Sequence, residues 1–179
     1  MKRLIAAVTL SFAVPIGAQD AQPLASAAVR TTFVVRDIDK SVRFYREVFG
    51  YRVKFDGKIG ATPQNRVLLA LKGDEDARFV ILDGERTFSG KAHEATGIGL
   101  LGFSGRKTPR LAQPKGNRFA GGQAMLAIMT SDIEAVMAGL RRHRAPILAG
   151  PVIAKDGRET EIVTSDPDGT RIHVVEQRP

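Results

Sequence analysis

The sequence predicts an α+β fold built from two β-α-β-β-β units, and two observations lead to this prediction. The first is a weak internal repeat, in which Asp37-Ile38 returns as Asp132-Ile133 after 95 residues. The second is a short apolar run that precedes each of these pairs in register, at 33–35 and 126–129. We therefore expect one chain to form the same unit twice.

Each apolar run is expected to lead into an amphipathic helix. In the first unit Asp37 is a typical N-cap and Gly50 a typical stop, and the apolar face is Ile38, Val42, Tyr45 and Phe49. In the second, Asp132 is the N-cap, three arginines follow in the last turn, and the apolar face is Ile133, Val136, Met137 and Leu140. Ser41 is expected on the helix surface.

Short β-rich runs follow each helix. We expect strands at 52–55, 67–71 and 78–82 in the first unit, and at 147–148, 151–154, 160–164 and 171–176 in the second. The last two strands are joined by residues 166–169, whose sequence DPDG fits a type I turn between antiparallel strands.

These elements predict a first module at residues 28–85, a Gly-rich basic linker at 86–123 and a second module at 124–177. A linker of this length is either functional or contains an extra strand, for which 98–103 is the candidate. The sequence leaves open whether 78–82 or 98–103 closes the first sheet.

Residues 1–18 have the pattern of a secretory signal peptide, with a basic start, an apolar stretch and a small-residue exit. A cleavage site as late as residue 27 also fits. We expect export to the periplasm or beyond, and no membrane span once the signal is removed, because no other segment is apolar enough.

The 179 residues include no cysteine, which excludes a disulfide framework, a thiolate nucleophile and a Cys-ligated zinc. The formal charge of +8 falls to +6 if Lys2 and Arg3 leave with the signal, and it favours anionic partners. Nucleic acid is not an expected partner, because there is no Trp and only 6% of residues are aromatic. A merely solvated basic surface is the alternative.

Two stretches, DIDKSVRFYREVFGYRV at 37–53 and SDPDGTRIHVVE at 165–176, resemble the opening and closing signatures of the vicinal oxygen chelate superfamily. Its members include glyoxalase I, extradiol dioxygenases and bleomycin- or fosfomycin-resistance proteins. The resemblance implies that the sheets curl into a mixed-sheet cup whose concave face carries the site, and that two chains form a homodimer. It does not imply one reaction, because the superfamily spans several enzyme classes and pure binders.

Strand alternation assigns the faces of this cup. Phe33 and Val35 are apolar and must lie under the helix, so the side chains of opposite parity face away from it. Extended to the second unit and the last strand, this parity predicts a cup lined by Arg30, Thr32, Met125, Met129, His173 and Val175.

The resemblance also places the metal ligands of metal-dependent members at Arg30, Met125 and His173, with a fourth position near Leu82, Asp83 or Gly102. Arg30 has no lone pair to offer, and Met125 is a weak ligand for hard or borderline ions. We therefore expect no metal cofactor. The alternative is a divalent metal in a glyoxalase-like lyase or dioxygenase that uses His173 with other ligands.

The function expected first is the binding of a small anionic or amphipathic molecule. Arg30 would hold an anionic oxygen through forked hydrogen bonds, and His173 would act as general acid or base. The alternatives are a salt bridge from Arg30 to Glu176 or a linker acid, and a hydrogen-bonded core histidine at 173. A third reading is an envelope protein that works through its basic linker.

The run GIGLLG at 97–102 matches the dinucleotide-binding pattern G-x-G-x-x-G. No helical pattern follows it, and no acid stands where one would bind a ribose, so we expect no nucleotide cofactor.

Overall fold

The structure is a computed structural model that describes residues 30–84, 87–88, 91–92, 97–114, 118–153, 157 and 159–177. The predicted signal peptide lies outside these residues. Their elements are β1 (Arg30–Val35), α1 (Ile38–Phe49), β2 (Arg52–Lys58), α2 (Pro63–Leu68), β3 (Asp76–Asp83), β4 (Thr87–Phe88), β5 (Lys91–Ala92), β6 (Gly97–Ser104), β7 (Met125–Thr130), α3 (Ile133–Arg142), β8 (Ile147–Ile153), β9 (Glu159–Ser165) and β10 (Arg171–Gln177).

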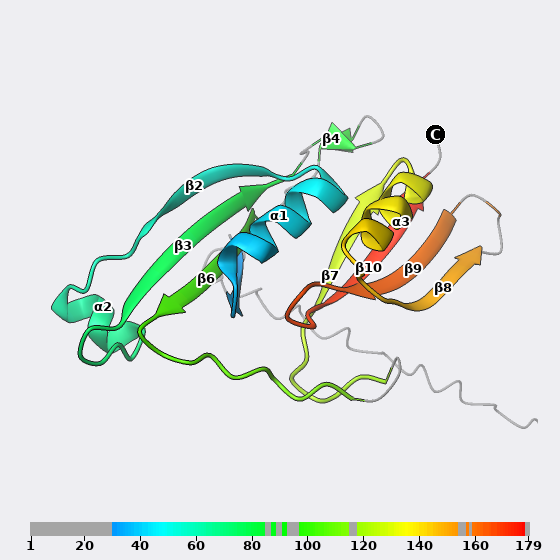
Figure 1. The fold of residues 1–179 in the computed structure, drawn as a ribbon. Coiled ribbons are helices and arrows are strands. Elements are labelled where there is room, and N and C mark those ends of the chain that lie inside the picture. The colour runs from blue at the N-terminus through cyan, green and yellow to red at the C-terminus, as the bar shows by residue number, and fades with distance from the viewer. Residues whose placement is uncertain are drawn as a thin grey trace, which may run out of the picture.

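The main strands form two four-stranded sheets with the same topology (Figure 1). The first has the order β1-β6-β3-β2 and the second the order β7-β10-β9-β8, while β4 and β5 form a separate small pair. In each sheet the strand that comes first along the chain, β1 or β7, pairs in parallel with the strand that comes last, β6 or β10. The other neighbouring strands are antiparallel. The predicted α+β class with two repeated β-α-β-β-β units is confirmed.

Both strands between which the sequence did not decide belong to the first sheet. The run 78–82 lies in β3, and the run 98–103 lies in β6, which inserts between β1 and β3. The first sheet therefore extends to Ser104, into the segment predicted as linker. β6 is buried at five consecutive positions, which suits a central strand covered on both faces.

The strand predicted at 67–71 is wrong, because residues 63–68 form α2. Thr62 caps this helix by accepting a hydrogen bond from the Asn65 N–H, and Pro63 occupies its first turn, so local capping outweighs the apolar run. Val67 and Leu68 remain 81% and 78% exposed. In the second sheet, the two short strands expected before residue 155 are one strand, β8, interrupted by register shifts.

Both long helices begin at the predicted caps. The Asp37 carboxylate accepts the Lys40 N–H, the Asp132 carboxylate accepts the Ala135 N–H, and Gly50 ends α1 at a φ of 71°. The prediction for Ser41 is wrong, because its side chain is fully buried. α1 buries a wider arc than the predicted stripe, since Phe44 and Val48 are buried as well.

One core joins the two modules. It contains the helix-facing residues of both sheets together with α1 and α3, which pack directly on each other. The helices cross closely at Gly139, where an added Cβ would lie 3.1 Å from the Val48 Cα. Figure 1 shows α1 and α3 adjacent at the centre of the molecule.

A buried carboxylate reinforces the junction between the modules. Asp166, 3% exposed at the β9–β10 turn, accepts backbone N–H groups of Asp168 and Thr170 and the Tyr45 hydroxyl of α1 at 3.1 Å. Burial raises the pKa of Asp166, and this outweighs the lowering effect of its hydrogen bonds. Close by, Arg36 donates from Nε to Asp168 at 2.7 Å.

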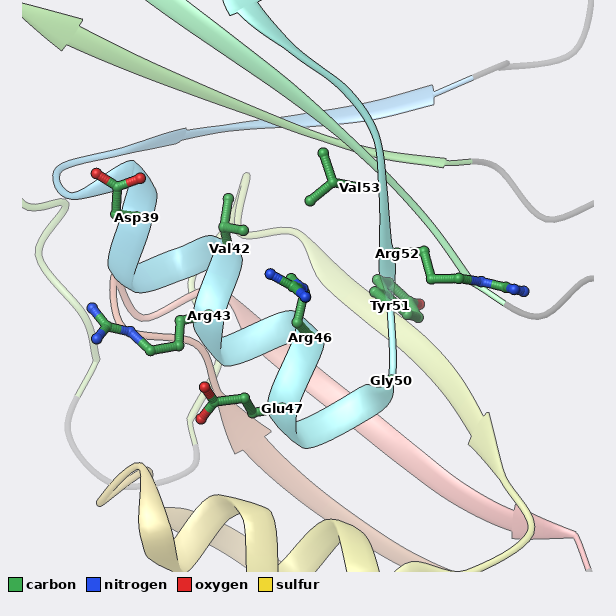
Figure 2. A pocket seen from close by; sticks show the side chains of 9 residues that line it. All are labelled: Asp39, Val42, Arg43, Arg46, Glu47, Gly50, Tyr51, Arg52 and Val53. Atoms are coloured by element: carbon green, nitrogen blue, oxygen red, sulfur yellow. The ribbon is translucent and has the colours of Figure 1, made fainter.

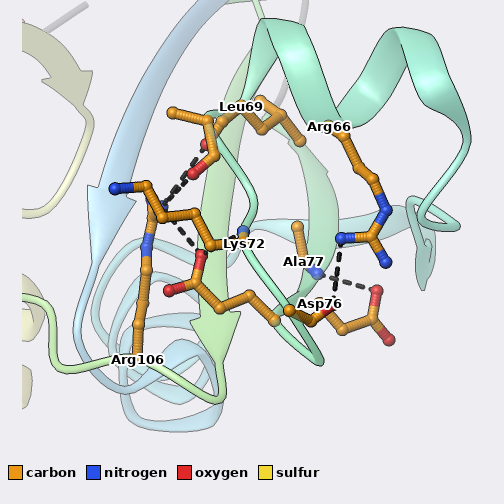
Figure 3. A network of polar contacts seen from close by, with 9 residues as sticks. Arg66, Leu69, Lys72, Asp76, Ala77 and Arg106 are labelled. Atoms are coloured by element: carbon orange, nitrogen blue, oxygen red, sulfur yellow. Dashed lines mark hydrogen bonds and ion pairs between the residues drawn. The ribbon is translucent and has the colours of Figure 1, made fainter.

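A second, smaller cluster covers part of the first sheet on the face away from α1. Leu71, Ala77 and Leu101 form it, with Phe79 and Phe103 packed against it. Arg106 covers this cluster, with its guanidinium carbon 3.5 Å from the centre of the Phe103 ring. Its Nη1 also donates to the carbonyls of residues 69 and 70 (Figure 3). The segment around α2 is thereby held against the sheet.

Replacing Tyr45 with Phe removes one donor from the buried Asp166 carboxylate and should lower the free energy of unfolding by about 1–3 kcal/mol. The pKa of Asp166 is raised in the folded chain. The contribution of Asp166 to the free energy of unfolding is therefore fully present below pH 3.8, its ordinary pKa, and is lost as the pH rises through the pKa of the folded chain. Losing the donor raises that pKa further, so urea unfolding should show a larger penalty at about pH 7 than at about pH 4.

The matched control is Tyr51→Phe, which deletes a hydroxyl from the ring stacked on Tyr45. Burial raises the pKa of Tyr51 to about 12, so this hydroxyl stays neutral at both pH values and its loss should cost the same at each. A penalty for Tyr45→Phe that did not change with pH would contradict the role assigned to Asp166.

Candidate functional site

The structure places the six predicted site residues on the faces turned away from the helices. Val35 in β1 and Ile172 and Val174 in β10 are fully buried in the shared core. By alternation, Arg30 and Thr32 lie on the outer face of the first sheet, and four residues lie on the outer face of the second: Met125, Met129, His173 and Val175.

The two groups stand on different sheets, which share no strand pairing. In the part of the chain that the structure describes, no hydrogen bond or ion pair joins Arg30 or Thr32 to the group on the second sheet. The structure thus brings together Arg30 with Thr32, and His173 with its neighbours on β7 and β10.

Arg30 is exposed, and its guanidinium carbon lies 5.4 Å from the centre of the Phe79 ring. It makes no ion pair with another described residue. The expected alternative, a salt bridge to Glu176, is contradicted because Glu176 lies on the helix side of β10 and accepts the Ile133 N–H at 3.1 Å. Arg30 therefore presents its charge to solvent over an aromatic ring.

The register of the strands locates the fourth family position in the first module. Ala127 pairs with His173 in the second sheet, and its repeat equivalent Thr32 pairs with Gly99 in the first. Gly99, rather than Leu82, Asp83 or Gly102, is thus the counterpart of His173. A Cβ at Gly99 would lie 2.6 Å from the Thr32 hydroxyl oxygen and 2.9 Å from the Phe79 ring, so these side chains already fill the place.

Glu161 contacts a predicted site residue, and the sequence did not single it out. It projects from β9, and its Oε2 lies 2.7 Å from His173 Nε2, with the His173 side chain 27% exposed. His173 is therefore a half-exposed imidazole oriented by a carboxylate rather than a core histidine. The pair is diagonal in the β9–β10 register, in which Val163 is directly opposite His173 and Glu161 is opposite Val175.

Arg171 is a second residue that the sequence did not single out. It shares the outer face of β10 with His173, yet it is only 2% exposed. It donates to the Arg118 carbonyl at 3.2 Å and lies 5.6 Å from the centre of the Phe119 ring. The segment before β7 thus covers one end of the outer face, while Met125 at the start of that strand stays 46% exposed.

These residues do not fit a divalent-metal centre. The positions at which metal-dependent relatives carry ligands hold the guanidinium of Arg30, the thioether of Met125, Gly99 and the imidazole of His173. This set has too few donor atoms for octahedral or tetrahedral coordination. Among the described residues, no group of three or more His, Cys, Asp or Glu side chains could hold an ion.

A cavity of about 340 Å³ opens at the junction of the modules and includes one predicted site residue, Thr32. Its walls come from β1, the segments 108–113 and 122–124, and the turn at 168–170. Gln113 and Gln123 are hydrogen-bonded to each other at 2.7 Å in one wall. A cavity of this size at a module junction suits a small molecule.

None of the helices in the described ranges is long and apolar enough to cross a bilayer.

The fold belongs to the α+β proteins that repeat one β-α-β-β-β module on a single chain. In each module the first strand is parallel to the last. The family model for the Glyoxalase/Bleomycin resistance protein/Dioxygenase superfamily matches residues 27–174. This chain belongs to that superfamily.

Solved structures with the same fold are distant in sequence. A glyoxalase family protein from Bacillus cereus is 16% identical, with a TM-score of 0.67 over 91% of this chain and 100% of the other. The trypanothione-dependent glyoxalase I of Leishmania major is 20% identical, with a TM-score of 0.54 over 85% and 87%. Glyoxalase I from Zea mays is 16% identical, with a TM-score of 0.55 over 85% and 45%. No curated protein matches the chain.

Replacing Gly99 with Ala tests the packing at the fourth family position. The new methyl group would collide with Thr32 and the Phe79 ring, and overpacking of this kind costs about 1–3 kcal/mol in the free energy of unfolding. Urea unfolding of Gly99→Ala should show this loss, and adding Thr32→Ala should restore part of it. Gly60→Ala is the control, because a Cβ there meets nothing within 4 Å. Equal penalties at Gly99 and Gly60 would contradict the assignment.

Proposed function

We propose that this chain binds a small anionic or amphipathic molecule on the outer faces of its sheets, with Arg30 as the anchor. The observation that carries the proposal is the exposed Arg30 guanidinium, which has no ion pair among the described residues. Such a group has its forked donors available for a carboxylate or phosphate.

His173 supplies the proton-transfer group of the proposal. Glu161 fixes the imidazole through Nε2, which orients the ring and leaves its other nitrogen for a ligand. A general acid or base of this kind needs no metal, in keeping with the donor set described above. Met125 and Met129 lie on the same face and would adapt to an apolar part of the ligand.

Arg30 lies on the first sheet and His173 on the second. One ligand can contact both only if the outer face of a first module and that of a second module, from the same chain or from two chains, enclose one cavity. We propose that a homodimer supplies or completes this enclosure. The edge strands β1 and β7 expose Val34 (52%) and Met125 (46%), and exposed apolar edge strands are usually covered by a partner.

Replacing Arg30 with Ala should weaken the binding of benzoate or phenylphosphate at least about tenfold in calorimetric titrations, because a forked ionic contact is lost. Arg30→Lys should bind with intermediate affinity, since it keeps the charge and loses the fork. Arg142→Ala is the control, because it removes an equal charge from the exposed end of α3. Unchanged binding by Arg30→Ala would remove Arg30 from the site.

Light scattering should give twice the mass of the single chain, and the double variant Val34→Glu with Met125→Glu should give the mass of one chain. Both side chains are exposed, so the double variant should fold, as circular dichroism can check. A monomeric wild-type protein would contradict the proposed homodimer.

A further inference from the structure

A groove with a volume of about 860 Å³ lies between α1 and β2 on the helix-covered side of the first sheet. Figure 2 shows its walls: Val42, Arg43 and Arg46 come from the helix, Tyr51 lies just before β2, and Val53 lies in β2. Val53 is 41% exposed, so the groove has an apolar patch open to solvent. None of the site residues discussed above lines it.

The charges of the groove are not balanced. Its two acids are already engaged outside it, since Asp39 accepts from Arg78 at 2.8 Å and Glu47 lies 2.8 Å from His143 of α3. The side chains of Arg43 and Arg46 make no hydrogen bond or ion pair with any described residue. In Figure 2 the Arg46 side chain lies between Val42 and β2, whereas the Arg43 side chain extends to the other side of α1. The groove therefore offers positive charge to an acidic occupant.

One wall of the groove is an open strand edge. β2 is the last strand of the order β1-β6-β3-β2, so its outer edge has no strand partner among the described residues. Six of its seven residues are exposed. Main-chain donors and acceptors along such an edge can pair with an added strand, and a helix beside the edge can read the side chains of that strand.

We propose that the groove between α1 and β2 binds an extended acidic peptide segment of a partner protein, which adds as a strand to β2 and places a carboxylate on Arg46. The main-chain pairing requires an extended chain, and Arg46 selects acidic side chains. Val42 and Val53 contact the apolar side chains that alternate with the acids.

The probe is a fluorescent peptide of alternating Glu and Val with the seven-residue length of β2. Fluorescence anisotropy should show saturable binding that weakens with salt. A peptide with Lys in place of Glu should not bind. A peptide N-methylated at alternate amides keeps its charges but cannot form the strand pairing, and it should bind at least about tenfold more weakly.

The protein variant is Arg43→Glu with Arg46→Glu, and the control is Arg141→Glu with Arg142→Glu. The control makes the same change in net charge, and Arg141 is the repeat equivalent of Arg46 on α3. All four side chains are exposed, so both proteins should fold. The groove variant should lose at least about tenfold in affinity for the acidic peptide and the control less than about twofold.

Equal losses in the two variants would overturn the proposal, because they would show general attraction to a basic protein. Equal binding of the N-methylated peptide would overturn the strand addition, and so would an absence of binding at low salt. Because Arg30 lies outside the groove, these outcomes are independent of the proposed small-molecule site.

Discussion

The direct packing of α1 on α3 is the contact on which the arrangement of the two modules depends. The glycine at 139 favours this close approach, because a Cβ there would lie 3.1 Å from the Val48 Cα, which is tighter than an ordinary van der Waals contact. Around this contact the Phe44 ring meets His143 edge-on, and the buried Asp166 carboxylate takes the Tyr45 hydroxyl. The second sheet is thereby tied to α1 of the first module, and the two helices hold the modules together on the faces of the sheets that they cover.

The features that the sequence predicted are those with local causes. Asp37 and Asp132 cap their helices because a short carboxylate at that position satisfies free N–H groups, and the burial of alternate residues follows from strand geometry. The same capping argument applies at Thr62-Pro63, where it indicates the helix α2 rather than the predicted strand. The apolar content of 67–71 does not by itself distinguish a strand from a helix, whereas the start signal before it does.

The features that the sequence could not predict depend on pairing between distant segments. β6 inserts between β1 and β3, so the order of strands in space differs from their order in the chain. Glu161 meets His173 only because the β9–β10 turn sets a register that makes them diagonal neighbours. The glycines of GIGLLG are likewise explained by packing, since an added Cβ at Gly99 would meet Thr32 and one at Gly102 would lie 3.1 Å from Ile38 of α1.

The two repeated units differ at the positions on which the proposed function depends. Thr32 and Gly99 in the first sheet correspond to Ala127 and His173 in the second. In the first unit the missing side chain lets Phe79 fill the space, and the ring then supports the permanent cation of Arg30. In the second unit a small residue stands beside His173, which Glu161 orients. A guanidinium stabilises an anion without exchanging protons, whereas an imidazole is a side chain that can act as a general acid or base. We therefore propose that the first unit supplies the fixed charge and the second the proton-transfer group, because only the second has a side chain at the position shared by Gly99 and His173.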